Sequence, residues 1–121
     1  MRPHENLEVW KKAIEMVTEV YEITQSFPTE EKFGLTSQIR RAVVSIPANI
    51  TEGVARKSDK EFCNFLSIAQ GSASELETEL LIAKNLKYLS VERYQKIYEE
   101  VNTIARMIIG LSQKVKSRIK Q

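Results

Sequence analysis

Apolar residues recur at intervals of three and four along four stretches of the chain, which is the spacing that gathers them on one face of an α-helix. The stretches cover about residues 7–25, 34–56, 59–87 and 91–116. We expect their core positions to be Trp10, Ala13, Ile14, Val17, Tyr21 and Thr24; Leu35, Ile39, Ala42, Val43, Ile46, Ile50 and Val54; Phe62, Leu66, Ala69, Ala73, Leu76, Leu80 and Ala83; and Tyr94, Ile97, Val101, Ile104, Ile108, Leu111 and Val115.

Residues with strong local preferences separate these stretches. Asn6, Ser58 and Ser90 stand where side-chain oxygens can cap the first, third and fourth helices. Pro28 biases Phe27 away from helical angles and so ends the first helix. A further proline, Pro47, lies inside the second stretch, but the apolar stripe keeps its phase across it. We therefore expect one helix kinked at Pro47.

Long amphipathic helices with short connections predict an all-α fold, an up-down-up-down antiparallel four-helix bundle. At 121 residues the chain is expected to form one domain, residues 1–121, with a basic tail over residues 114–121. No apolar run reaches the length of a membrane span, and no apolar stretch that would form a signal peptide follows the N-terminus. A single cysteine, Cys63, fits a reducing compartment, so we expect a cytoplasmic protein.

The sequence offers little for metal or cofactor chemistry. Its one histidine, His4, lies near the N-terminus, and Cys63 has no partner at ligand spacing. No glycine-rich phosphate loop occurs. We expect no metal, no cofactor and no enzymatic activity.

Polar residues form a row along the second stretch at steps of three and four: Gln38, Arg41, Ser45, Asn49, Glu52 and Arg56. One interpretation is a structural hydrogen-bonded network of Ser45, Asn49, Glu52, Ser72 and Glu75, with Arg41 paired to Glu75 and the amide or hydroxyl groups satisfying carbonyls freed near Pro47. The other is a catalytic cleft built on Asn49, Glu52 and Ser72. The network is favoured because no nucleophile has a base beside it. The small residues around Gly71 predict close helix packing against Ala42.

Charge is distributed unevenly along the chain. The net formal charge is only +2, but residues 34–57 carry +3 and residues 89–121 carry +4, while the other two segments are acidic. The simpler explanation of this uneven charge is attraction between neighbouring helices of opposite charge. The alternative is a nucleic-acid site, for which the candidates are Arg40, Arg41, Arg56, Lys57, Lys114, Lys116, Arg118 and Lys120.

Two helices carry more apolar residues than one bundle interior can bury, which suggests a subunit interface. The surplus residues are Phe65, Ile68 and Ile82 on the third stretch and Met107, Ile108, Ile109 and Leu111 on the fourth.

Four strings together are similar to a known family. They are LEVWKKA (7–13), SFPTEEKFGL (26–35), QIRRAVVSIPANITEG (38–53) and FLSIAQGSASEL (65–76). On these residues the chain resembles the four-helix bundle proteins encoded in intervening sequences of bacterial large-subunit ribosomal RNA genes, some of which are labelled as a ribosomal protein. Thr51 departs from the family, which has alanine there, and residues after about 101 match weakly.

The resemblance implies a bacterial up-down bundle that assembles into a homo-oligomer, a pentameric ring. The family is also similar to accessory proteins of diversity-generating retroelements, which are basic pentameric barrels that bind nucleic acid and a reverse transcriptase. The expected function is therefore binding of structured RNA or DNA through basic residues that the ring gathers. The alternative is an adaptor that binds a protein, such as a polymerase or a ribosome-associated partner, through the first helix.

Overall fold

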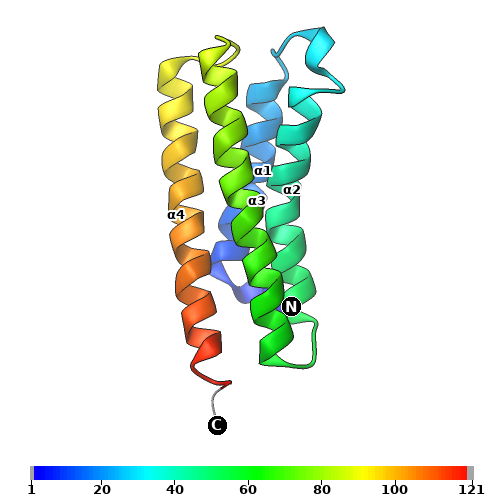
Figure 1. Ribbon diagram of the computed structural model, residues 1–121, viewed down its shortest axis with the longest axis vertical. Coiled ribbons are helices and arrows are strands. Elements are labelled where there is room, and N and C mark those ends of the chain that lie inside the picture. The colour runs from blue at the N-terminus through cyan, green and yellow to red at the C-terminus, as the bar shows by residue number, and fades with distance from the viewer. Residues whose placement is uncertain (1, 120–121) are drawn as a thin grey trace.

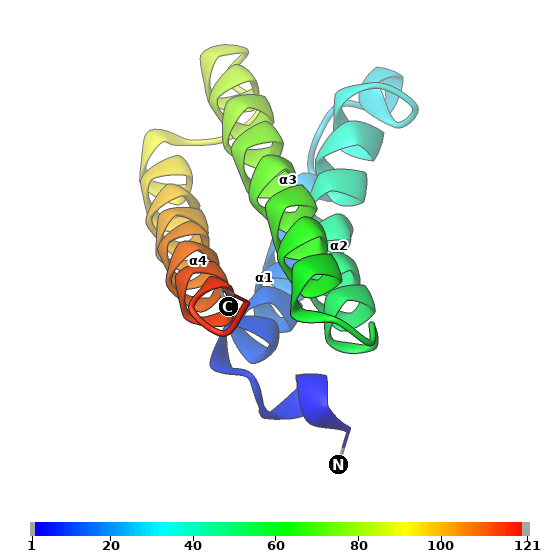
Figure 2. The ribbon, with the colours of Figure 1, turned by 60° about the horizontal axis from the view of Figure 1, so that its bottom comes forward.

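The computed structural model describes residues 2–119 and shows four helices packed side by side (Figure 1). They are α1 (Glu8–Thr24), α2 (Leu35–Val54), α3 (Asp59–Asn85) and α4 (Val91–Lys116), with short 3₁₀ turns η1 (Pro3–Asn6) and η2 (Thr29–Glu31). The order is up-down-up-down, and α3 separates α4 from α2 in the second view (Figure 2). The predicted all-α bundle is confirmed, and the expected helix bounds agree to within two residues. Within residues 2–119, no helix is both long and apolar enough to span a membrane.

Two of the three predicted caps form. The Ser58 hydroxyl accepts a hydrogen bond from the Glu61 amide at 3.1 Å, and the Ser90 hydroxyl accepts one from the Arg93 amide at the same distance. Asn6 does not cap α1, because it ends the turn η1 and the capping position falls on Leu7, which has no side-chain acceptor. Helix α3 ends in a Schellman motif in which Lys87 has a φ of 68°.

The expected stripes of α2, α3 and α4 are the observed core, except that Val54, Phe62, Tyr94 and Leu111, at or near the ends of the stripes, are half-buried. For α1 the predicted buried face was wrong, because it is rotated about the helix axis from the observed one. Its buried side is formed by Val9, Ala13, Met16, Val20, Ile23 and Thr24, whereas Ile14 and Tyr21 are exposed. Apolar residues occur on two sides of this helix, so periodicity alone did not decide which side faces α2 and α4.

Pro47 is buried inside α2, and the helix continues through it to Val54. The expectation of one continuous helix is therefore confirmed, while the kink itself stays a prediction. The Asn49 amide donates to the Ser45 carbonyl at 2.8 Å. It does not reach the Val43 carbonyl, which is the one that loses its partner because proline has no N–H.

Thr51, where the resemblance predicts alanine, has a structural role. Its hydroxyl oxygen accepts a hydrogen bond from the Trp10 indole nitrogen at 2.9 Å, which ties the start of α1 to the end of α2. The Trp10 ring also meets His4 edge-on, with ring centroids 5.2 Å apart. An alanine at position 51 has no acceptor for the indole N–H.

Candidate nucleic-acid interface

Five of the eight predicted basic residues meet at one end of the bundle. The α2–α3 turn supplies Arg56 and Lys57, and the end of α4 supplies Lys114, Lys116 and Arg118. Because α2 and α4 run in the same direction, their C-terminal ends lie at the same end of the bundle, the lower one in Figure 1. We call this group the basic end. Lys120 lies outside the described residues.

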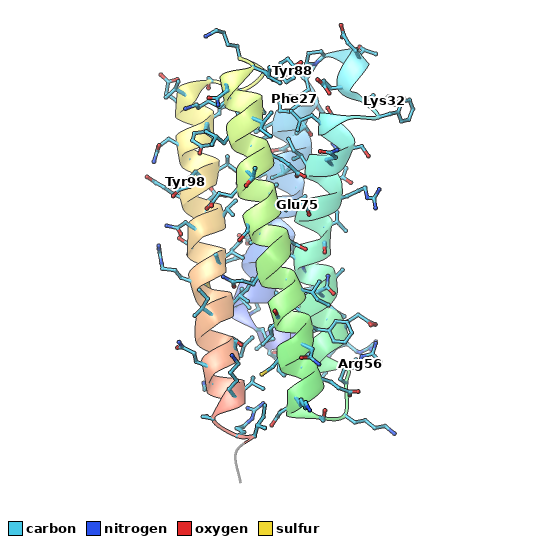
Figure 3. All side chains as sticks on the ribbon, viewed as in Figure 1. Phe27, Lys32, Arg56, Glu75, Tyr88 and Tyr98 are labelled. Carbon is cyan, nitrogen blue, oxygen red and sulfur yellow. The ribbon has the colours of Figure 1, made fainter. Side chains whose placement is uncertain are left out.

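Two arginines of the basic end are held by carboxylates. Arg118 makes a two-pronged pair with Asp59, at 3.1 Å from Nε and 3.0 Å from Nη2, and so joins the end of α4 to the start of α3. This hydrogen bonding lowers the pKa of Asp59 and raises that of Arg118. Arg56 bonds Glu52 at 2.6 Å and lies over the Phe65 ring, 4.9 Å from its centroid (Figure 3).

The three lysines of the basic end are exposed. Lys60, the second residue of α3, is also exposed and was missed in the sequence, although its position three residues after Lys57 was a signal. Counting Lys60, six basic side chains stand against three acidic ones, Glu52, Asp59 and Glu61. The end of α2, the start of α3 and the end of α4 together therefore carry a formal charge of +3, against +2 for the whole chain, while Glu8 of α1 lies beside Lys114 at the same end.

Arg40 and Arg41 do not belong to the basic end. They precede Arg56 by 16 and 15 residues, which is over about 20 Å along a helix. Arg40 serves the fold instead: it donates to the Thr24 hydroxyl at 2.9 Å and to the Tyr21 carbonyl at 3.2 Å, and its guanidinium lies 4.4 Å from the Tyr21 ring centroid. The adjacent Arg41 points to the other side of α2.

Arg41 lines a polar groove between α2 and α3, the two helices that pack most extensively. This α2–α3 groove has a volume of about 420 Å³ and is lined by Gln38, Arg41, Ala42, Ser45, Ser72, Glu75 and Glu79. Within residues 2–119, no ion pair joins Arg41 to Glu75, so the expected pair is not formed. Glu75 is exposed beside the groove (Figure 3).

Three residues of the expected polar network are joined by hydrogen bonds. The Ser45 and Ser72 hydroxyls lie 2.8 Å apart across the helix pair, and the Asn49 amide donates to the Ser45 hydroxyl at 2.9 Å. Glu52 is not part of it, because it pairs with Arg56. Close approach in this region does not depend on Gly71, since a Cβ there would meet nothing within 4 Å. Between α2 and α3 the tight contact is instead at Gly53, where a Cβ would lie 2.8 Å from the Phe62 ring.

Glu79 is the least expected member of the groove. Its side chain is 6% exposed, and one carboxyl oxygen is buried without a hydrogen-bond partner. Burial, and then repulsion from Glu75, raises the pKa of Glu79 to about 7. Its place one turn after Glu75 was visible in the sequence, but its burial was not.

A second charged cluster joins α1 to α4, which pack less extensively than the other neighbouring helices. Lys96 lies 3.0 Å from Glu19 and 3.4 Å from Glu100. Burial and the hydrogen bond with Glu19 raise the pKa of Glu100 to about 7, while that bond lowers the pKa of Glu19. These residues line a groove of about 450 Å³ with Glu15 and Glu99. The partners lie 77 residues apart, so no sequence pattern pointed to them.

Within residues 2–119, no three His, Cys, Asp or Glu side chains are grouped closely enough to hold an ion. Cys63 is a free thiol and contacts the Ser112 carbonyl at 3.9 Å.

Comparison with known proteins adds a family and a solved structure. Residues 5–110 match the model of the 23S rRNA-intervening sequence protein family. A crystal structure of a protein of unknown function from the S23 ribosomal protein family of Bacteroides thetaiotaomicron is similar, with a TM-score of 0.80 and 27% sequence identity over 87% of this chain and 95% of that one. A search of curated proteins found no match.

Proposed function

This chain belongs to the 23S rRNA-intervening sequence protein family, and from that premise we propose that it is a non-enzymatic, homo-oligomeric bundle that binds structured RNA, or other nucleic acid, through its basic end. The observation that carries the proposal is the convergence of two basic segments that lie far apart in the sequence. Arg56 and Lys57 meet Lys114, Lys116 and Arg118 at one end of the bundle.

The chemistry of the basic end suits phosphate groups. Exposed lysines supply mobile positive charge, and an arginine held by a carboxylate keeps other N–H groups free to donate. Phosphate binding is made more favourable by the release of condensed counterions, and this release requires several cations on one surface. A pentameric ring with the helices along its axis would place five basic ends on the same side, multiplying the local charge about fivefold.

The test is fluorescence anisotropy with a structured RNA and a matched DNA duplex, titrated over salt. We expect log affinity to fall linearly with log salt, at a slope that counts the phosphates neutralised. Reversing the charge at Lys57 and Lys116 (K57E/K116E) should flatten the slope without breaking an ion pair. The double variant R56E/K57E is less suitable, because it also breaks the ion pair between Arg56 and Glu52.

Lys87 supplies a matched control, because it is exposed at the opposite end of the bundle. K87E should bind as the parent protein does. Absence of binding at low salt would refute nucleic-acid binding, and equal losses in K57E/K116E and K87E would refute the assignment to the basic end.

A second candidate function is an adaptor that binds a basic protein segment in the acidic groove between α1 and α4. Glu15, Glu19, Glu99 and Glu100 favour it, since only Lys12 and Lys96 oppose them among the lining side chains. Pull-down from nuclease-treated lysate separates the two functions, because a partner bridged by RNA should be lost and a directly bound protein should remain.

A further inference from the structure

The basic end carries a flat surface as well as positive charge. The guanidinium of Arg56 lies over the Phe65 ring, with its central carbon 4.9 Å from the ring centroid (Figure 3). The Arg56 side chain is nevertheless 43% exposed, so the side of the guanidinium that faces away from the ring is open to solvent. A planar cation supported by a ring in this way is a surface onto which another flat group can stack. We call these two residues the Arg56–Phe65 platform.

Neighbouring residues hold both members of the platform in place. Gly53 allows α3 to approach α2 closely, since a Cβ at this position would lie 3.0 Å from the Cβ of Phe65. Glu52, four residues before Arg56, accepts a hydrogen bond from its Nη2 at 2.6 Å. The ring is thus seated on the helix pair, and the guanidinium is held at one edge. A ligand that stacks here loses little free energy in ordering these side chains, because they are ordered before it binds.

The ion pair with Glu52 also changes what Arg56 contributes to nucleic-acid binding. The pair is neutral as a whole, so Arg56 adds less to the attraction for phosphates than a free lysine does. Lys57 and Lys60 are both exposed and, within residues 2–119, form no ion pair. These lysines therefore suit phosphate groups, whereas the feature particular to Arg56 is its flat face.

The other cation–ring contacts of the described chain do not provide such a face at the basic end. Arg40 lies 4.4 Å from the Tyr21 ring centroid, but its guanidinium also donates to the Thr24 hydroxyl and the Tyr21 carbonyl and so serves the fold. The remaining contacts within residues 2–119 use the ammonium groups of Lys32 and Lys84, which are not planar. A planar cation over a ring therefore coincides with the basic end at the platform alone in this part of the chain.

We propose that the Arg56–Phe65 platform stacks an unpaired base, so that the basic end recognises RNA at a loop or bulge rather than along a continuous duplex. Bases in a duplex are stacked on one another, whereas unpaired bases can turn outward onto aromatic rings or arginine planes. Lys57 and Lys60, close to Arg56 in sequence, supply the charge for the phosphates next to that base. The inference rests on the proposed function and narrows its ligand to a single-stranded segment.

Fluorescence anisotropy with two RNA hairpins of equal length tests the platform. One hairpin has a loop of unpaired nucleotides, and the other has abasic nucleotides in the same loop, so both carry the same phosphates but only the first carries loop bases. The parent protein should bind the intact loop at least about 5-fold more tightly, which is the smallest effect expected from one stacked base. The slope of log affinity against log salt should be the same for both hairpins, because it counts phosphates.

Matched variants separate stacking from charge. R56K keeps the positive charge and can still pair with Glu52, but it has no plane, so it should bind the two hairpins equally. K57Q removes one charge and leaves the platform intact, so it should weaken the binding of both hairpins by the same factor and keep the preference for the intact loop. F65L removes the ring and should also lose most of that preference. Circular dichroism verifies folding, and R56K, at an exposed position, decides the question even if F65L fails to fold.

The outcomes separate this inference from the proposed function. Equal affinity of the parent for the two hairpins would refute the platform while leaving RNA binding at the basic end in place. Absence of binding to either hairpin at low salt would refute the proposed function, and the platform with it. A preference for the intact loop that persists in R56K would show that another group holds the base, and the assignment to Arg56 would then be wrong.

Discussion

Replacing Glu79 with glutamine should remove a pH dependence from the stability of the bundle. Glutamine has nearly the shape of a protonated glutamate but does not ionise. Because Glu79 is buried and close to Glu75, its pKa in the folded protein is raised to about 7, against an ordinary value of 4.5. The folded state therefore holds this proton more tightly than the unfolded state does.

The sign and size of the effect follow from that difference. Below about pH 4.5 Glu79 is protonated in both the folded and the unfolded state, so it does not lower the free energy of unfolding. As pH rises from 4.5 to 7 the unfolded chain loses the proton first, so the free energy of unfolding falls by about 1.4 kcal/mol per pH unit. The total loss is about 3 kcal/mol, complete above pH 7. E79Q should match the parent at pH 4 and be more stable by up to about 3 kcal/mol at pH 8.

Urea unfolding followed by circular dichroism from pH 4 to 8 measures this difference. Glu100, whose pKa is also raised to about 7, contributes equally to parent and E79Q and cancels in the comparison. E100Q, which alters the α1–α4 cluster, is the control for that contribution. A difference between the parent and E79Q that does not change with pH would refute the reasoning.

Three further predictions concern packing and local geometry. G53A should destabilise the fold by about 1–3 kcal/mol, because its Cβ would meet Phe62 at 2.8 Å. G71A should instead stabilise the fold by up to about 1 kcal/mol, because its Cβ would face open space. Equal melting temperatures for the two variants would contradict this prediction. K87G should raise the melting temperature by relieving the left-handed φ of 68° at the end of α3, worth about 1 kcal/mol. T51A should cost about 1 kcal/mol by leaving the Trp10 indole N–H without its acceptor, and the Trp10 fluorescence should shift as well; an unchanged urea midpoint would show that water replaces the hydroxyl.

Local patterns were sufficient to predict the elements of the fold. Apolar spacing placed four helices and nearly all of the core of α2, α3 and α4, because a helix face depends only on residues three and four apart. The caps Ser58 and Ser90 were equally visible, since each acts on an amide three residues away. The two basic segments could also be identified, although nothing in the pattern said whether they meet.

Only the tertiary structure decided how these elements use their side chains. It turned α1 so that Met16 is buried and Tyr21 is exposed, and it directed Arg40 to Thr24 while Arg56 remained at the basic end. It also buried Glu79 beside α2 and joined Lys96 to an acid 77 residues away. These outcomes depend on which helices are neighbours and on how each is rotated, and both are set by contacts between residues far apart in the sequence, which periodicity within one helix does not contain.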